Sequence, residues 1–97
     1  MTVYAIAQGR VSDRQQFNRY LEKSGPTLAE HGARLLAVDE TPQTIEGEID
    51  FPRTVILEFD STEHFQRWYD SAEYRAARKL REMAADGRFM LVQGLPA

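Results

Sequence analysis

Apolar and β-branched residues occur along this chain in short runs that are bounded by Gly, Pro or polar residues. Runs of this kind are typical of β-strands. The run RTVILEF is the clearest of them, and the run TVYAIAQG ends at Gly9, as a strand that leads into a turn does. The predicted strands are residues 2–9, 33–40, 53–59 and 88–94.

A first helix is expected between the first two strands, because apolar residues recur there at helical spacing. Ser12 is predicted to be its N-cap, with Gln15 three residues further on in the spacing of a capping box. The pair Gly25 and Pro26 interrupts the backbone hydrogen bonds, so we expect a kink or a restart there, and Gly32 ends the helix. The apolar stripe consists of Phe17, Tyr20, Leu21 and Leu28.

The stretch between the third and fourth strands predicts two short helices joined at a corner. Asp60 or Ser61 caps the first helix, and Asp70 or Ser71 caps the second, because these side chains accept hydrogen bonds from backbone N–H groups two or three residues further on. Gly87 is expected to end the second helix. The buried stripe is predicted to contain Phe65, Trp68, Tyr69, Tyr74, Ala77, Leu80 and Ala84.

The segment TIEGEID, residues 44–50, alternates polar residues with apolar residues or Gly, which predicts a solvent-facing strand or hairpin arm. Its acidic residues Glu46, Glu48 and Asp50 suit the protection of a strand edge better than a cation site. The element order β-α-β-β-α-β therefore predicts an α+β fold of the ferredoxin-like type, in which an antiparallel sheet carries its helices on one face.

The predicted sheet is apolar on both faces. A sheet with helices on one side and water on the other alternates apolar with polar residues. In the first predicted strand, the apolar residue Ile6 stands between Ala5 and Ala7, so both faces carry apolar residues. In the second, Leu35 and Ala37 are expected to share one face, and the other face is also apolar. Because helices within the chain cover one face only, we predict that the other face pairs with a second copy, giving a homodimer through the sheet.

Composition narrows the classes of function. The 97 residues fit one domain, residues 1–97, and the net charge of −3 argues against a nucleic-acid partner. The apolar run at the N-terminus is too short for a signal peptide or a membrane span, so a cytoplasmic protein without a membrane partner is expected. The absence of cysteine excludes thiolate chemistry and Cys-rich zinc sites. Two histidines far apart in sequence do not suggest haem or metal, so no cofactor is expected.

Glu58 is the first candidate for chemistry. It lies between Leu57 and Phe59 in an apolar strand and faces the opposite side of the sheet, toward the predicted dimer interior. A partly desolvated carboxylate is suited to proton transfer, which makes Glu58 a candidate catalytic base. The alternative is a structural ion pair with Arg34 or another strand arginine, and Arg34 is itself a candidate ligand-binding residue.

Trp68, Tyr69 and Tyr74 are candidates for the aromatic wall of a ligand pocket, since aromatic side chains dominate such linings. Core packing is the alternative, and helical spacing favours it for Trp68. Arg81 lies in a basic helix that is otherwise expected to be solvated. If Arg81 reaches inward, it holds a carboxylate ligand with bidentate geometry.

His64 is predicted to lie at the solvated surface. Asp60, Ser61 and His64 stand within one turn of a helix start, where capping explains the first two, and the chain has no G-x-S-x-G elbow to present a nucleophile. His31 precedes Gly32 and fits a helix C-terminus, where a partly protonated ring meets the helix dipole.

An ordered set of segments resembles the DUF1330 family, a branch of the dimeric α/β-barrel superfamily. These segments are HGARLLAV, then EGE followed by PRTVILEFDS, then WYDSAEYRAARKLR and a closing LVQG, and together they span nearly the whole chain. The chain departs from the family pattern at Val38 and Asp39, where relatives typically have Arg-Gly, and at Phe65 and Ala72.

The resemblance implies two ferredoxin-like protomers whose sheets face each other. Superfamily members place ligands in a cleft between sheet and helices, and they include cofactor-independent monooxygenases, muconolactone-type isomerases and haem-binding proteins. We therefore expect a homodimer that binds a small molecule in such a cleft. One alternative is a cofactor-independent isomerase or monooxygenase acting on a small cyclic or aromatic acid, with Glu58 as base and Arg81 or Tyr74 holding the anion. The other is a structural dimer without a ligand cleft.

Overall fold

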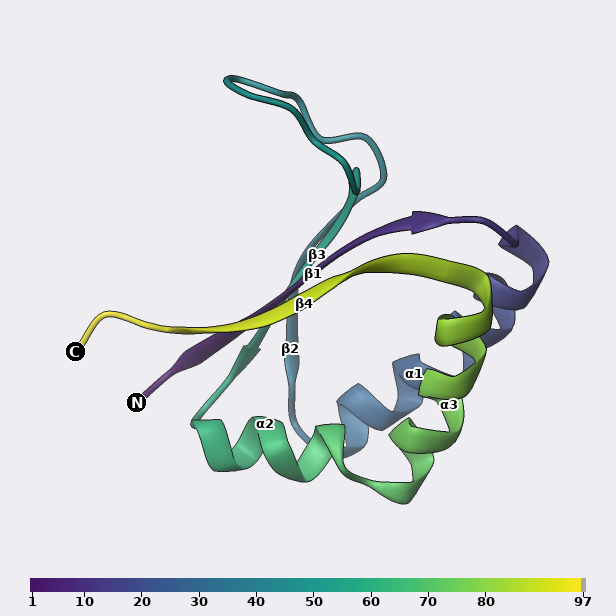
Figure 1. Ribbon diagram of the computed structural model, residues 1–97. Coiled ribbons are helices and arrows are strands. Elements are labelled where there is room, and N and C mark those ends of the chain that lie inside the picture. Colours follow the sequence, from purple (N-terminus) through teal and green to yellow (C-terminus); the bar gives the residue numbers. More distant parts are fainter. Residues whose placement is uncertain (97) are drawn as a thin grey trace.

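The computed structural model describes residues 1–96. Four strands form one layer, and the helices pack against a single face of that layer (Figure 1). Along the chain the elements are β1 (Val3–Val11), α1 (Arg14–Glu30), β2 (Arg34–Asp39), β3 (Arg53–Phe59), α2 (Thr62–Tyr69), α3 (Ala72–Ala84) and β4 (Ala85–Gln93).

The sheet has the strand order β2-β3-β1-β4, and each neighbouring pair is antiparallel. β1 lies in the middle, with Ala5 paired with Leu57 of β3 on one side and with Leu91 of β4 on the other. Each helical connection crosses over a strand, as expected when β1 and β2 run in the same direction with β3 between them. The predicted α+β, ferredoxin-like βαββαβ fold is confirmed.

One face of the sheet, the helix face, carries the core. Val3 pairs with Phe59 and Ala5 pairs with Leu57 in the register of β1 and β3, and all four residues are buried. Trp68 of α2 and Tyr74 and Ala77 of α3 pack against them from the helix layer. Because strand side chains alternate between faces, the core residues of β1 and β3 stand at every second position.

The other face of the sheet, the open face, has no helix over it. Its central apolar residues are the alternate members of the same pairs: Ile6 lies opposite Ile56 and Met90, and Tyr4 lies opposite Val92. Met90 and Val92 are 43% and 40% exposed, and the other three are half-buried. Apolar residues therefore occupy both faces of the central strands, as the sequence predicted.

β2 departs from the predicted alternation. The register of β2 with β3 shifts between Leu35 and Ala37, so that Leu35 lies opposite Leu57 while Ala37 lies opposite Ile56. A β-bulge of this kind inserts one extra residue and reverses the faces that follow it. The expectation that Leu35 and Ala37 share a face is therefore wrong, and Leu35 and Val38 both lie on the helix face.

The first helix begins one residue later than predicted. Asp13, rather than Ser12, is the N-cap, and its side chain accepts from the backbone N–H of Gln16. Ser12 instead donates through its hydroxyl to the carbonyl of Ala84 at 3.0 Å, the carbonyl that also accepts from the backbone N–H groups of Ser12 and Asp13. α1 continues through Pro26 to Glu30 without a restart, because only one N–H is lost and the neighbouring hydrogen bonds remain.

Residues 40–52 form an arm between β2 and β3 that projects away from the helices (Figure 1). Segment 44–50 contains no strand, so of the two predicted forms the arm is present and the strand is not. The arm turns at Gly47, whose φ of 82° is a conformation that favours glycine. At its base, Phe51 lies beneath the guanidinium groups of Arg10 and Arg88, which are 5.8 Å and 5.1 Å from the ring centroid.

Gly87 lies inside β4 rather than at the end of a helix. α3 ends at Ala84, and β4 begins at once with Ala85, three residues earlier than predicted. Gly87 pairs with Gly9 of β1, and the two backbones approach so closely that side chains are excluded. A glycine within a strand can mark a place where two backbones approach closely, and Gly87 marks such a contact.

We expect Gly87→Ala to lower the free energy of unfolding by roughly 2–4 kcal/mol, because an added Cβ would meet backbone atoms that cannot move aside. That Cβ would lie 2.1 Å from the carbonyl oxygen of Gln8 and 2.9 Å from Cα of Gly9. Gly9→Ala is the matched control, since its nearest atom, the carbonyl oxygen of Asp86, is 3.3 Å away. Equal losses for the two variants in urea denaturation would contradict this account of the Gly9–Gly87 contact.

Candidate functional site

A cleft of about 490 Å³ opens between the helix face of the sheet and helices α1 and α3. This volume lies within the range of small-molecule sites, which are mostly apolar with a few polar groups. The side chains that line it come from every layer of the fold, so the site depends on the packed structure rather than on one loop. Its apolar lining includes Phe17, Tyr20, Leu28, Leu35, Val55, Leu57, Trp68 and Phe89.

Trp68 belongs to both the core and the cleft. It is 2% exposed, and its ring lies 4.1 Å from that of Tyr74 between centroids. Its indole Nε1 donates to Thr27 Oγ1 at 3.0 Å, and Thr27 in turn donates to the carbonyl oxygen of Ser24 at 2.6 Å. Because this chain of hydrogen bonds fixes the ring, Trp68 is a rigid part of the cleft wall.

Tyr74 and Tyr69 do not line this cleft. Tyr74 lies behind Trp68, is fully buried, and shares a hydrogen bond of 3.0 Å with the hydroxyl of Tyr20. Burial, together with the neighbouring Tyr20, raises the pKa of Tyr74 far above its usual value, so the phenol stays protonated. Tyr69 stacks on Phe65 beside a shallower hollow between α2 and β4, with Arg78 over its ring at 4.6 Å. A ligand-binding role for these two tyrosines stays a prediction.

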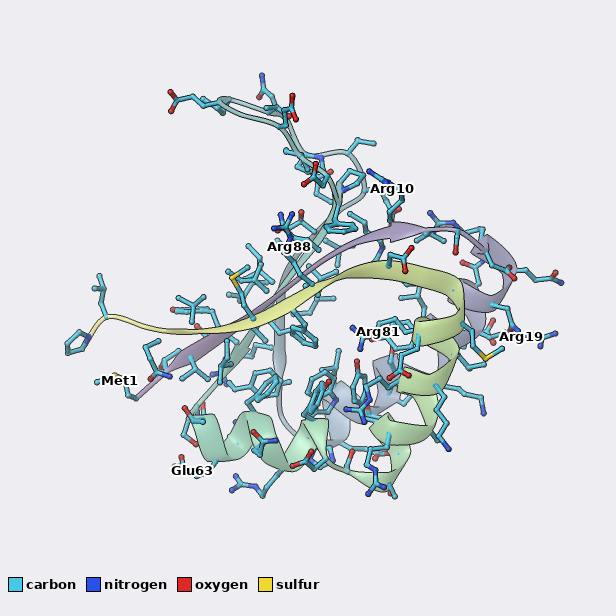
Figure 2. The ribbon with its side chains drawn as sticks, in the orientation of Figure 1. Met1, Arg10, Arg19, Glu63, Arg81 and Arg88 are labelled. Carbon is cyan, nitrogen blue, oxygen red and sulfur yellow. The ribbon has the colours of Figure 1, made fainter. Side chains whose placement is uncertain are left out.

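Arg81 reaches the cleft from the last turn of α3 and lies on the side of the helix that faces the sheet (Figure 2). Its Cζ lies 5.7 Å from the ring centroid of Phe89 in β4. Its Nε is buried, and within residues 1–96 no acceptor lies within hydrogen-bonding distance of it. The inward orientation considered for Arg81 is therefore present.

Glu58 and Arg34 lie together on the open face, away from the cleft. Arg34 Nε donates to Glu58 Oε1, and Arg34 Nη2 donates to Asp60 Oδ1 at 2.8 Å. These two carboxylates raise the pKa of Arg34, with Asp60 the larger cause, and Arg34 lowers the pKa of Asp60. The sheet thus separates Glu58 from the aromatic wall. The structure does not bring Glu58 to Trp68, Tyr74 or Arg81.

His64 is buried rather than solvated. Its Nδ1 accepts from the backbone N–H of Asp60 at 3.0 Å, and its Nε2 is bonded to the carbonyl oxygen of His31. These partners require a neutral ring that carries its proton on Nε2. The prediction of a surface role was wrong because it considered only local capping by Ser61, whereas the packing of α1 against α2 gives His64 a second partner 33 residues away.

Sequence reasoning missed two contributors to the cleft. Tyr20 was assigned only to an apolar stripe, although its hydroxyl meets that of Tyr74 across the helix layer. Arg53 was considered only as part of the strand RTVILEF, whereas its Cζ lies 4.8 Å from the ring centroid of Phe17 and its Nε lies 2.6 Å from Glu40 Oε2. The phenol that interrupts an apolar stripe was a usable signal for Tyr20, but the sequence held none for Arg53.

Neither a metal-binding cluster nor a membrane-spanning helix is present in residues 1–96. Between residues 1 and 96, no group of three or more His, Asp or Glu side chains is placed to hold a metal ion. No helix in that range has the length and apolar character needed to cross a membrane.

Residues 2–95 match the family described as domain of unknown function DUF1330. The chain belongs to the DUF1330 family. This confirms the resemblance found in the sequence. No curated protein matches the DUF1330 chain.

Solved structures share the fold of this DUF1330 protein. A protein of unknown function from Rhodopseudomonas palustris has a TM-score of 0.83 at 19% identity, over 99% of this chain and 84% of that chain. SnoaB, a cofactor-independent oxygenase from Streptomyces nogalater, has a TM-score of 0.67 at 10% identity, over 99% of this chain and 95% of that chain. A dabb family protein with a ferredoxin-like fold from Mesorhizobium loti has a TM-score of 0.64 at 16% identity, over 99% of this chain and 97% of that chain. At these identities the likeness shows a shared fold.

Proposed function

We propose that this DUF1330 protein is a homodimer that binds one small molecule in the cleft of each protomer. The observation that carries the proposal is the division of the sheet into two faces. The helix face contributes to a cleft of about 490 Å³, and the open face presents a separate apolar surface. Assembly through the open face leaves both clefts intact.

The open face supports a second copy of this chain as its partner. Tyr4, Ile6, Ile56, Met90 and Val92 form a continuous apolar group across three strands, as their register shows. Contiguous exposed apolar surface on a small protein marks an interaction site, and a second copy is the partner that is always present. The resemblance to the DUF1330 family, which implies protomers whose sheets face each other, supports the same choice of surface.

The cleft supports a small ligand with an apolar or aromatic body. Its lining is mostly aromatic and aliphatic, and Trp68 is held rigid by its bond to Thr27. A preformed apolar cleft binds such a body without a large ordering cost. SnoaB has the same fold and is a cofactor-independent oxygenase, so catalysis without a cofactor is compatible with this architecture.

An enzyme is the second candidate: a cofactor-independent isomerase or monooxygenase that acts on a small cyclic or aromatic acid. The observation that favours it is the side chain of Glu58, which is only 23% exposed and lies on the open face. In a dimer through that face, Glu58 would lie between the two sheets, where water is reduced. Glu58 would then act as a base in the dimer interior and not in the cleft.

We expect wild-type protein to be a dimer at micromolar concentration, and Ile6→Asp to be a monomer, because a charge would be buried in the apolar interface. Size-exclusion chromatography with light scattering measures the mass directly. Met83→Asp is the matched control, since Met83 is 67% exposed on α3, away from the open face. A wild-type monomer, or an Ile6→Asp dimer, would contradict assembly through this face.

Native mass spectrometry of gently purified protein is expected to show a dimer with additional mass that organic solvent removes. Leu28→Trp should abolish this mass, because the larger side chain fills the cleft that Leu28 lines. Leu95→Trp is the control, since Leu95 is 92% exposed. A bare dimer that also binds nothing from a small-molecule library would favour the structural dimer without a ligand.

For the enzyme, we expect Glu58→Gln to abolish pH-dependent turnover of an aromatic acid, while light scattering still reports a dimer. The amide keeps the size of the side chain but cannot accept a proton at neutral pH. Asp60→Asn is the control, since it breaks the other contact of Arg34 and leaves Glu58 in place. If Glu58→Gln only destabilises the fold, the ion pair with Arg34 is structural and Glu58 is not the base.

A further inference from the structure

We infer that the ligand of the cleft carries a carboxylate, and that this carboxylate binds the guanidinium of Arg81 and the hydroxyl of Tyr20. The ligand class is thus a small aromatic or cyclic acid. This inference rests on the proposed binding function and adds to it the chemistry of the ligand and the residues that recognise it.

The first observation is the state of Arg81. Its Nε is buried at the cleft, and in the described part of the chain Arg81 forms neither an ion pair nor a hydrogen bond through its side chain. Phe89 offers a cation–π contact at 5.7 Å, which satisfies no N–H group. Arg81 as a whole is half-buried, but a buried N–H group without an acceptor is costly, and the planar fork of guanidinium donors matches a carboxylate.

The other charged residues along the cleft are already neutralised or turned away from it. Arg53 pairs with Glu40 at 2.6 Å, and Glu40 also accepts from Arg14. Arg88 points to the opposite face of the sheet, where it lies over Phe51 and 3.8 Å from Asp50.

The two acidic residues at the cleft do not pair with Arg81. Glu82 lies 3.5 Å from Arg78, its partner one turn earlier in α3. Asp86 pairs in register with Arg10, and by strand alternation its side chain belongs to the open face. Among residues 1–96, Arg81 is therefore the one arginine that lines the cleft from the helix layer and has no carboxylate partner.

The second observation is the direction of the hydrogen bond between two tyrosines. Tyr74 is fully buried, and its only hydroxyl partner among the described residues is the hydroxyl of Tyr20 at 3.0 Å. If Tyr20 donated, the proton of Tyr74 would have no acceptor, so Tyr74 donates and Tyr20 accepts. Tyr20 lines the cleft, so its hydroxyl is then free to donate its proton to a ligand.

Arg81 lies near the tyrosine pair, on the same face of α3 as Tyr74. Arg81 and Tyr74 are seven residues apart, two turns along the same face of α3, and the side chain of a helical residue points back toward the N-terminus. The charge of Arg81 acts on Tyr74 and partly opposes the rise in pKa that burial causes. One guanidinium and one phenol hydroxyl thus line a cleft whose apolar side chains are aliphatic and aromatic, which fits an aromatic or cyclic acid.

The stability of Arg81→Met tests the first observation. Wild type and variant are first refolded from guanidinium chloride to remove any bound molecule. We then expect the variant to melt at a higher temperature than wild type, because a half-buried guanidinium whose buried Nε has no acceptor is replaced by an apolar side chain of similar length. Arg75→Met, at an exposed position of the same helix, should leave the Tm unchanged. A lower Tm for Arg81→Met would show that Arg81 has a structural partner and would overturn the inference.

Binding of matched probes tests the ligand class. We expect wild type to bind 2-naphthoate about 10- to 100-fold more tightly than the uncharged 2-naphthamide in isothermal titration calorimetry, the factor that a charge-assisted hydrogen bond provides. Arg81→Met should remove this preference, Tyr20→Phe should reduce it, and Arg75→Met should keep it.

The outcomes separate this inference from the proposed function. Equal affinity for acid and amide in wild type would overturn the carboxylate site and leave the cleft as a binding site. A preference for the acid that survives in Arg81→Met would place the anion elsewhere and overturn the assignment to Arg81. Binding of neither probe to wild type at millimolar concentration would contradict both the carboxylate site and the proposed cleft.

Discussion

Apolar side chains on both faces of one antiparallel sheet are the constraint on which the rest of this structure depends. β1 and β3 alternate buried residues such as Ala5 and Leu57 with the open-face pair Ile6 and Ile56. The chain supplies helices for one face only (Figure 1). Because burial of apolar surface is the main favourable term in folding and association, the open face favours a partner in the same way that the helix face favours α1 and α3.

Hydrogen bonds join the helices of the layer to one another at several points. At one end, Ala84 accepts from Ser12 and Asp13, joining the end of α3 to the start of α1. At the other, His64 joins the end of α1 to the start of α2, and Trp68 is bonded to Thr27. These bonds fix how the helices lie relative to one another, and the cleft opens between two of them and the sheet.

The same division separates the two candidate chemistries. Arg81 and Tyr20 belong to the cleft on the helix face, whereas Glu58 and Arg34 belong to the open face. A base at Glu58 and an anion site at Arg81 could not act on one small molecule within a single protomer, because the sheet lies between them. Binding in the cleft and chemistry at Glu58 are therefore separate hypotheses with separate tests.

The sequence was sufficient for the fold and for the two faces, because strand alternation and helix caps are local patterns. It placed α2, α3 and the corner between them correctly. Ser61 is the N-cap of α2, and Ser71, at the corner, is the N-cap of α3. It failed at Gly87 and at the bulge after Leu35, where contact with a neighbouring strand decides the conformation. It also misplaced the N-cap of α1 by one residue, because Ser12 bonds to Ala84 instead.

The candidate site was predicted less completely than the fold. The inward reach of Arg81 was foreseen as one of two orientations, but the burial of His64 and the pairing of Tyr20 with Tyr74 were not. These contacts join residues 33 and 54 positions apart, so no local pattern in the sequence announces them.

The central claim is that the open face joins two copies while the helix face keeps its cleft. Isotope-filtered NOE measurements on a mixture of labelled and unlabelled protein test this directly, because they detect only contacts between copies. The account predicts such contacts from the methyl groups of Ile6, Ile56, Met90 and Val92, and none from Leu28 or Val55 in the cleft. Contacts between copies that arise from Leu28 or Val55, or the absence of any from the open face, would contradict it.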